Sequence, residues 1–482
     1  MLTHARRAVE SALQAGASYA DARVNRLRTE ELSVRNGELA VAIAQEELGI
    51  GVRVLLDGCW GFAAAPIERD ASPSELASLA RRALRVAEAL APSRRLPVRL
   101  AGEPGHVAEF ATPVRIEPFA VSLAEKLDLL RRADESMRGA SETVVRESSS
   151  SLRLEEQWQA SSEGAAIYQH LVRSGAGLST TAASRGQVER RSYPASFGGN
   201  YLSGGWERVL AMELPAHGAR MRDESVALCG APACPAGVRD LILSGNQLML
   251  QIHESVGHAD ELDRVFGAEI DLAGGSFATP DQLGRLRYGS PIVNLVADSG
   301  LEGGLDTRGF DDEGVASGAW PIVEDGIFCG YHTSREWAGR IGEEHSRGTS
   351  RAQGWYHPPI IRITNLSLLP GTWSLEELIA DTEDGVLCDT VKMWSIDSKR
   401  VNFQFTTEIG WEIRGGRLAG ILRSPTYQGR TTEFWNSCDA ICDARHWMLW
   451  GVPNCGKGNP MQVAEMSHGA APARFRKVNF VR

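Results

Sequence analysis

Residues 244–258 read SGNQLMLQIHESVGH, and the interpretation of the surrounding chain starts from this stretch. Ser244 and Gln247 have the spacing of a capping box, which is typical of a helix N-terminus. Apolar residues then recur at helical spacing, at Leu248, Ile252 and Val256. The stretch therefore predicts a helix with one buried face and one face exposed to solvent.

Two histidines with a glutamate between them make the end of this helix a candidate metal site. His253 and His258 can bind a divalent transition metal, zinc above all, through neutral imidazoles. Glu254 follows the first histidine directly and can take the proton from a metal-bound water, as in HExxH metallopeptidases. The alternative interpretation is a helix with two histidines on its polar face and no metal.

The HExxxH spacing is one residue longer than HExxH, and it requires a distorted helix. On a regular helix, positions i and i+4 lie about 40° apart, whereas positions i and i+5 lie about 140° apart. A π-bulge would bring the two imidazoles into line, and such bulges gather at functional sites. Gly257 stands where this loosening, or an early end of the helix, is expected, because its backbone is permissive.

A catalytic metal also needs a third protein ligand and an open position. Spacing alone does not choose among the candidates, which are Cys455, His345, His357, His446, Asp260 and Glu261.

Further motifs relate the chain to a known family. Besides residues 253–258, they are LDTRGFDDEGV at 305–315, EDGI at 324–327 with GY at 330–331, RITN at 362–365 with LPG at 369–371, and NCGK at 454–457. On these residues the chain resembles the TldD/PmbA family of metalloproteases, in its HExxxH-bearing TldD branch. The resemblance is strong from about residue 225 to 465, and before that it is one of layout only.

The resemblance implies a site and an activity. In TldD-type proteins the cysteine of the Cys-Gly-Lys segment is the third metal ligand, and Cys455 occupies that place. The implied reaction is zinc-dependent hydrolysis of unfolded peptides or flexible segments, with one zinc per chain held by His253, His258 and Cys455 and with water activated by Glu254. After Cys-Gly-Lys the chain runs through Gly458–Gln462, which is shorter than the family segment, so the substrate cleft can differ there.

Assembly and substrate binding are also implied by the resemblance alone. It implies a dimer that encloses a cavity, either a homodimer or a heterodimer with a related subunit that lacks HExxxH. The substrate would bind as an added β-strand, read through its backbone. A noncatalytic scaffold subunit of the same fold is the alternative, and the intact HExxxH and Cys455 count against it.

Composition agrees with a folded two-domain enzyme. The chain has 482 residues, more than one core usually supports, and its 50 glycines predict many turns and hence a β-rich architecture. The formal net charge of −10 argues against nucleic acid as a partner. The sequence contains no run of 18 apolar residues, so no membrane span is expected. The N-terminal 16 residues have an amphipathic helix pattern rather than that of a signal peptide, and the eight cysteines lack disulfide spacing. We therefore expect a cytoplasmic protein.

The pattern along the chain predicts an α+β fold. Helices are expected over residues 1–16, 72–90, 122–137 and 374–381, and strands over 20–32 and 39–55 with an Asn36-Gly37 turn between them. Residues 142–213 have the pattern of a strand meander. A composition shift at 229–235 predicts a boundary between an N-terminal α/β domain, residues 1–225, and a C-terminal domain, residues 226–482. The family resemblance implies that the second domain is a curled, barrel-like antiparallel sheet carrying the metal-binding helix.

Three other patterns have competing interpretations. Residues 451–457 fit GxxxxGK and suggest a nucleotide-binding loop, but position eight is Gly458 rather than Ser or Thr. Asp311, Asp312 and Glu313 could attract a basic peptide, support a metal site or form a solvated turn. Cys438 and Cys442 have the first spacing of some iron–sulfur motifs, yet no third cysteine follows at short range, so buried free thiols are expected.

Overall fold

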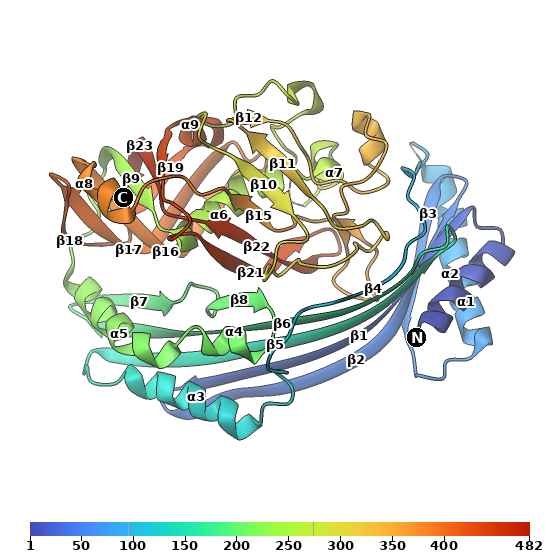
Figure 1. Cartoon of the computed structure of the whole chain (residues 1–482), viewed down its shortest axis with the longest axis horizontal. Coiled ribbons are helices and arrows are strands. Elements are labelled where there is room, and N and C mark those ends of the chain that lie inside the picture. The colour runs from blue at the N-terminus through green and yellow to red at the C-terminus, as the bar shows by residue number, and fades with distance from the viewer. Residues whose placement is uncertain (95, 273) are drawn as a thin grey trace.

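A computed structural model describes residues 1–94, 96–272 and 274–482. The first half of the chain forms one long curved sheet with helices at its ends and on its outer face, and the second half lies against the concave face of that sheet (Figure 1). The α+β class expected from the sequence is confirmed.

The N-terminal sheet is built around the pair β1 and β2. Both strands are long, and residues Asn36 and Gly37 between them have φ angles of 52° and 89°. Positive φ at both central residues is the requirement of a type I′ hairpin turn, so the predicted turn is confirmed. The sheet consists of β1 (Tyr19–Arg35), β2 (Glu38–Leu56), β3 (Cys59–Pro66), β4 (Val107–Ala111), β5 (Thr143–Ser161), β6 (Ala166–Ser184), β7 (Gln187–Tyr193) and β8 (Asn200–Ser203).

Helices cover this sheet where the pattern predicted them and also at two places where it did not. The helices are α1 (Leu2–Gln14), α2 (Pro73–Leu90), α3 (Leu123–Ser136), α4 (Trp206–Leu210) and α5 (Leu214–Gly230). Ser72 and Ser122 form the capping boxes of α2 and α3, as expected. The meander predicted over 142–213 is wrong at its end, where α4 forms, and α5 had no prediction. Gly218 interrupts the apolar pattern of α5, because the helix approaches Ser136 of α3 closely there.

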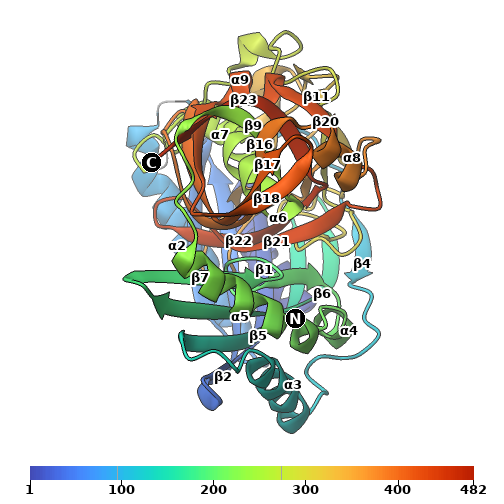
Figure 2. The same ribbon diagram turned by 90° about the vertical axis from the view of Figure 1, so that its left-hand side faces the viewer.

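The C-terminal half contains a closed barrel. Strands β16, β9, β23, β19 and β17 pair in that order, and β16 pairs back with β17 (Figure 2). The expected curled, barrel-like sheet is confirmed, and it departs from antiparallel pairing at one step, because β16 and β9 run parallel. The barrel and its additions comprise β9 (Gly237–Leu243), β16 (Asp384–Ile396), β17 (Asn402–Arg414), β18 (Arg417–Arg423), β19 (Thr426–Arg430), β20 (Cys438–Ile441) and β23 (Ala473–Val481).

Smaller elements complete this half of the chain. The strands are β10 (Leu295–Asp298), β11 (Ala319–Glu324), β12 (Ile327–Phe328), β13 (Ser350–Arg351), β14 (Ile360–Ile361), β15 (Leu366–Leu368), β21 (Met448–Lys457) and β22 (Gln462–Ala470). The helices are α6 (Gly245–Ser255), α7 (Leu262–Val265), α8 (Leu375–Ala380) and α9 (Thr431–Asn436). Helix α8 begins at the predicted cap, Ser374, with its capping box formed.

Helix α6 is buried all round, which corrects the expectation of a half-exposed helix. It packs against β16 of the barrel on one side and against β15, β21 and β22 on the other. Its predicted capping box is also wrong. Ser244 is the N-cap residue, but the one proton of its hydroxyl is shared between Asn246 Oδ1 and Asp389 Oδ1, at 2.6 and 2.7 Å, and Gln247 donates to Tyr427 instead. Burial on both sides explains this, because the polar side chains of the first turn find partners on the barrel.

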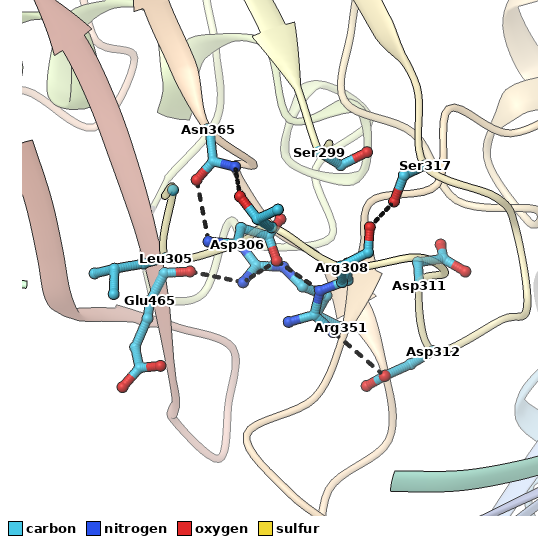
Figure 3. A network of polar contacts seen from close by, with 12 residues as sticks. Ser299, Leu305, Asp306, Arg308, Asp311, Asp312, Ser317, Arg351, Asn365 and Glu465 are labelled. Carbon is cyan, nitrogen blue, oxygen red and sulfur yellow. Dashed lines mark hydrogen bonds and ion pairs between the residues drawn. The ribbon is translucent and has the colours of Figure 1, made fainter. Parts of the chain in front are cut away.

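Buried charges join the two halves of the chain. Arg23 on β1 donates to Asp312 at 2.7 Å, and Arg53 on β2 donates to Glu313 at 3.0 Å. Asp311 accepts backbone N–H groups from Glu313, Val315 and Ser350. Figure 3 shows Asp311 and Asp312 within the wider polar network that also contains Asp306, Arg308 and Arg351. The solvated turn considered for residues 311–313 is therefore wrong, because all three carboxylates are buried.

Removing Asp312 should destabilise the protein strongly. Asp312→Ala leaves the buried Arg23 guanidinium without its carboxylate, and breaking a buried ion pair costs about 3–5 kcal/mol. Chemical denaturation should show this loss in the free energy of unfolding. The control is Asp128→Ala, which removes an exposed helical pair with Arg132 and should cost less than about 1 kcal/mol. Equal stability losses in both variants would contradict the importance of the buried pair.

Candidate metal centre

Helix α6 ends early, and that end places the two histidines. The helix stops at Ser255, and His258 lies in a separate 3₁₀ turn, Gly257–Ala259. Of the two distortions considered for HExxxH, the early helix end is the one observed, rather than a π-bulge. A side chain at position 257 would crowd Ile363, because a Cβ there would lie 2.8 Å from the Ile363 Cδ1 atom. Glycine thus allows this turn to pack closely.

His253, His258 and Cys455 meet in the interior. Their nearest ligand atoms all lie within 4.8 Å of one another, and the Cys455 Sγ atom lies 3.5 Å from His258 Nε2. All three residues are buried. Cys455 is on β21, directly after a register shift in its pairing with β22. Such irregularities redirect side chains, which is consistent with the thiol facing the histidines.

Hydrogen bonds orient His253 so that one ring nitrogen stays free. His468 Nδ1 lies 2.8 Å from the carbonyl oxygen of Leu366, so this nitrogen must donate. Burial holds the pKa of His468 well below its ordinary value, so its Nε2 carries no proton and accepts. That atom lies 2.8 Å from His253 Nδ1, which therefore donates. The Nε2 lone pair of His253 is left available for a metal.

His258 is oriented in the same way by a carboxylate. Its Nδ1 lies 2.7 Å from Glu261 Oε2, which leaves Nε2 facing Cys455. Burial alone would raise the pKa of Glu261, but Lys457 and His258 outweigh it and hold this pKa well below its ordinary value. Lys457 is itself buried, 3.2 Å from Glu261 and 2.7 Å from Asp263. The second ring nitrogen of each histidine thus has its own partner.

The donor set fits zinc. Burial lowers the pKa of His253 to about 4, so its imidazole is neutral at neutral pH. Burial alone would raise the pKa of the Cys455 thiol, but His258 and Arg362 outweigh it and leave this pKa below its usual value, which favours the thiolate. Two imidazoles and one thiolate are ligands that zinc prefers, and three protein ligands leave a fourth position open.

Glu254 faces the same space but has partners of its own. One carboxylate oxygen accepts the indole N–H of Trp394 at 2.8 Å, and the other pairs with Arg400 at 2.6 Å. Burial alone would raise the pKa of Glu254, but His258, His253 and Arg400 together lower this pKa by more. The net shift is downward, so Glu254 is ionised at neutral pH. A cavity of about 380 Å³ is lined by Glu254, His253, His258, Cys455, Trp394 and Arg400, among others. A carboxylate and a metal-type triad therefore share one cavity.

The remaining ligand candidates lie elsewhere or have other partners. Asp260 is bonded to His332, and Glu261 is bonded to His258 and Lys457. His345 is exposed and bonded to the carbonyl of Gly102, His357 lies beside Arg23, and His446 accepts from the backbone of Leu375. Among the described residues, the group that could hold a metal ion is the one with Cys455.

The nucleotide-loop interpretation of residues 451–457 is wrong. These residues belong to strand β21, which pairs with β22, whereas a phosphate loop must open a helix. Lys457 is enclosed by two carboxylates rather than free for a phosphate. Cys438 and Cys442 are buried free thiols, as expected.

Sequence reasoning missed three residues of the site. His468 lies 13 positions after Cys455 in an ordinary strand, and nothing in its local pattern points to a role. Trp394 and Arg400 lie on the hairpin formed by β16 and β17. Arg400 has a φ of 64°, rare for a residue other than glycine, but backbone strain cannot be read from sequence.

The geometry of the site and the sequence similarity to known proteins together define the class of protein as a metallopeptidase. The PmbA/TldA metallopeptidase C-terminal domain matches residues 238–481, and domain 1 and the central domain of the same family match residues 20–87 and 116–226. The chain belongs to the PmbA/TldA metallopeptidase family.

Individual relatives agree with this assignment. The chain is 28% identical to a metalloprotease of Methanocaldococcus jannaschii over 93% of this chain and 94% of that protein. It is 25% identical to a zinc metalloprotease TldD homolog of Saccharolobus solfataricus, over 50% of this chain and 51% of that one. TldE from Thermococcus kodakarensis has a similar fold, with a TM-score of 0.75 and 16% identity over 99% of this chain and 100% of that one. Among the described residues, none of the helices has the length and apolar character of a membrane span.

Removing His468 should weaken metal binding although His468 is not a candidate ligand. His468→Ala deletes the acceptor that orients His253, and losing such an outer partner typically costs about 10- to 100-fold in metal affinity. Competition with a chromophoric zinc chelator measures the effect. His446→Ala, at a distant backbone contact, should leave the affinity unchanged. Unaltered affinity in His468→Ala would show that His253 needs no such support.

Proposed function

We propose that this protein is a zinc-dependent peptidase of the TldD type, with one zinc per chain held by His253, His258 and Cys455. The proposal rests on one observation: these three buried residues lie close together and line the same cavity as Glu254. The zinc named in the S. solfataricus relative supports the choice of metal. Zinc bound there would act as a Lewis acid towards water and the scissile carbonyl group.

Glu254 is proposed to move the protons of the reaction. Because it is ionised, its carboxylate can accept the proton of the attacking water and later give it to the nitrogen of the leaving amine. Trp394 and Arg400 hold the carboxylate in place through one oxygen each, and each oxygen keeps a further lone pair for the water.

The proposed substrates are unfolded peptides or flexible segments, bound as an added β-strand. Family membership supports this proposal, as does a cavity of about 380 Å³ that is too small for a folded domain. We propose a homodimer or a heterodimer with a related subunit lacking HExxxH. The structural similarity to TldE supports the second arrangement. We further propose a cytoplasmic location and two domains, residues 1–225 and 226–482.

Glu254→Gln should retain zinc and lose peptidase activity. The amide keeps the shape of the side chain but cannot accept the proton, and general-base contributions are about 100- to 10,000-fold. Initial rates on an unstructured fluorogenic peptide, with zinc content measured in parallel, test this. Glu433→Gln, at an exposed helix position, is the matched control. Wild-type rates in Glu254→Gln would overturn the assignment, whereas zinc binding without hydrolysis by the wild-type protein would favour the scaffold alternative.

Zinc should protect Cys455 from alkylation. A thiolate bound to zinc is shielded, so a strong chelator should increase its reaction with iodoacetamide, and added zinc should reverse the increase. Peptide mapping distinguishes Cys455 from Cys329, the half-buried cysteine that serves as an internal control and should react equally in both states. Cys455→Ala should also lower zinc occupancy. Equal labelling of Cys455 with and without zinc, together with full occupancy in the alanine variant, would place the third ligand elsewhere.

A further inference from the structure

The turn between β16 and β17 holds one residue in a strained conformation beside the metal centre. Arg400 has a φ of 64°, which costs free energy for a side chain with a Cβ. The surrounding turn is nevertheless held by several hydrogen bonds. Asp397 accepts from the backbone N–H groups of Lys399, Val401 and Asn402 at 2.8–3.0 Å, and Thr431 donates to the carbonyl of Arg400 at 2.6 Å. The turn therefore fixes the backbone position from which the Arg400 side chain extends.

The guanidinium of Arg400 uses only part of its hydrogen-bonding capacity. Its Nη1 pairs with Glu254 at 2.6 Å, but its buried Nε has no hydrogen-bond partner among the described residues. A buried donor without a partner is costly, so such groups in native proteins call for an explanation. Arg400 lines the cavity that also contains His253 and Cys455. The guanidinium of Arg400 thus lies next to the place where a substrate would bind, while its Nε atom is enclosed by protein.

We propose that Arg400 is a catalytic residue that binds the carbonyl oxygen of the scissile peptide bond and stabilises the negative charge that develops there. The proposal rests on the peptidase function proposed above and names the residue that holds the oxyanion. The group recognised is a main-chain amide, which every peptide carries. Recognition of this group requires no particular side chain in the substrate.

The charge balance of the reaction suits this position. Before attack, the negative charge opposite Arg400 is on Glu254. When water attacks the carbonyl carbon, its proton moves to Glu254, a carbon–oxygen bond forms, and the π-electron pair of the carbonyl moves to its oxygen. The negative charge has then left Glu254 and is on the substrate oxygen. The same guanidinium can hold the charge in both states, and its fixed turn avoids reorganisation during the step.

The competing explanation is that Arg400 only positions Glu254. Arg400→Gly tests whether the guanidinium is needed at all, because glycine accepts a φ of 64° and removes the guanidinium without adding backbone strain. Zinc content should stay near wild type, whereas thermal stability should fall, because the buried Glu254 loses its cation. The kcat value should fall by about 100- to 1,000-fold, the usual cost of losing an oxyanion donor, with little change in KM. Lys399→Ala, which removes an exposed cation from the same turn, is the matched control and should change neither.

Two further measurements test contact with the oxyanion rather than positioning. Calorimetry should show that Arg400→Gly loses much more affinity for a phosphinic peptide, which mimics the tetrahedral oxyanion, than for the matching amide peptide. Guanidinium chloride at sub-denaturing concentration should restore part of the activity of Arg400→Gly and none of that of Glu254→Gln. Arg400→Lys, which keeps the charge but not the Nε donor, should recover activity only in part.

Several outcomes would overturn the proposal. Wild-type kcat in Arg400→Gly, or equal affinity losses for the phosphinic and amide peptides, would exclude contact with the oxyanion. Loss of zinc in parallel with activity would assign Arg400 a structural role. Failure of the wild-type protein to hydrolyse any peptide would instead reject the peptidase function itself, so the two failures are distinguishable.

Discussion

The candidate metal centre depends on one constraint, which is that two histidines five positions apart must face the same point inside the protein. A regular helix separates such positions by about 140°, so α6 has to stop between them. It does so at Ser255, and the following turn brings His258 back beside His253. Close packing of Gly257 on Ile363 allows that turn. Cys455 reaches the histidines from β21, directly after the register shift in the pairing of β21 with β22.

Burial of these groups is possible because each has a partner behind it. His253 is held by His468, which is held in turn by the Leu366 carbonyl, and His258 is held by Glu261. Glu261 and Asp263 share Lys457, the lysine of the Cys-Gly-Lys segment. Uncompensated buried charges cost several kcal/mol each, so this pairing is what permits ionisable groups at such depth. The lysine that resembles a phosphate-loop residue neutralises carboxylates instead.

The long N-terminal sheet supports this arrangement from outside the barrel. Its arginines reach Asp312 and Glu313 in the loop beyond β10, and Arg173 on β6 pairs with Glu465 on β22 at 3.1 Å. The β21–β22 hairpin therefore lies between the barrel and the sheet. Asn454 on that hairpin lines both the cavity of the candidate metal centre and a second cavity of about 420 Å³ against β1 and β5. The sheet thus forms part of the surroundings of the site.

Local sequence determined the elements whose signals are local. The Asn36-Gly37 turn, the serine caps of α2, α3 and α8, and the histidines and glutamate of HExxxH were all readable, because each depends on neighbours a few residues away. Cys455 was proposed as a ligand through family resemblance, since spacing left six candidates open. Only the tertiary structure decided that α6 is buried on both sides, that Asp312 meets Arg23, and that His468, Trp394 and Arg400 reach the site. Those contacts join residues more than a hundred positions apart, and they exist only once the barrel closes and the hairpins fold over it.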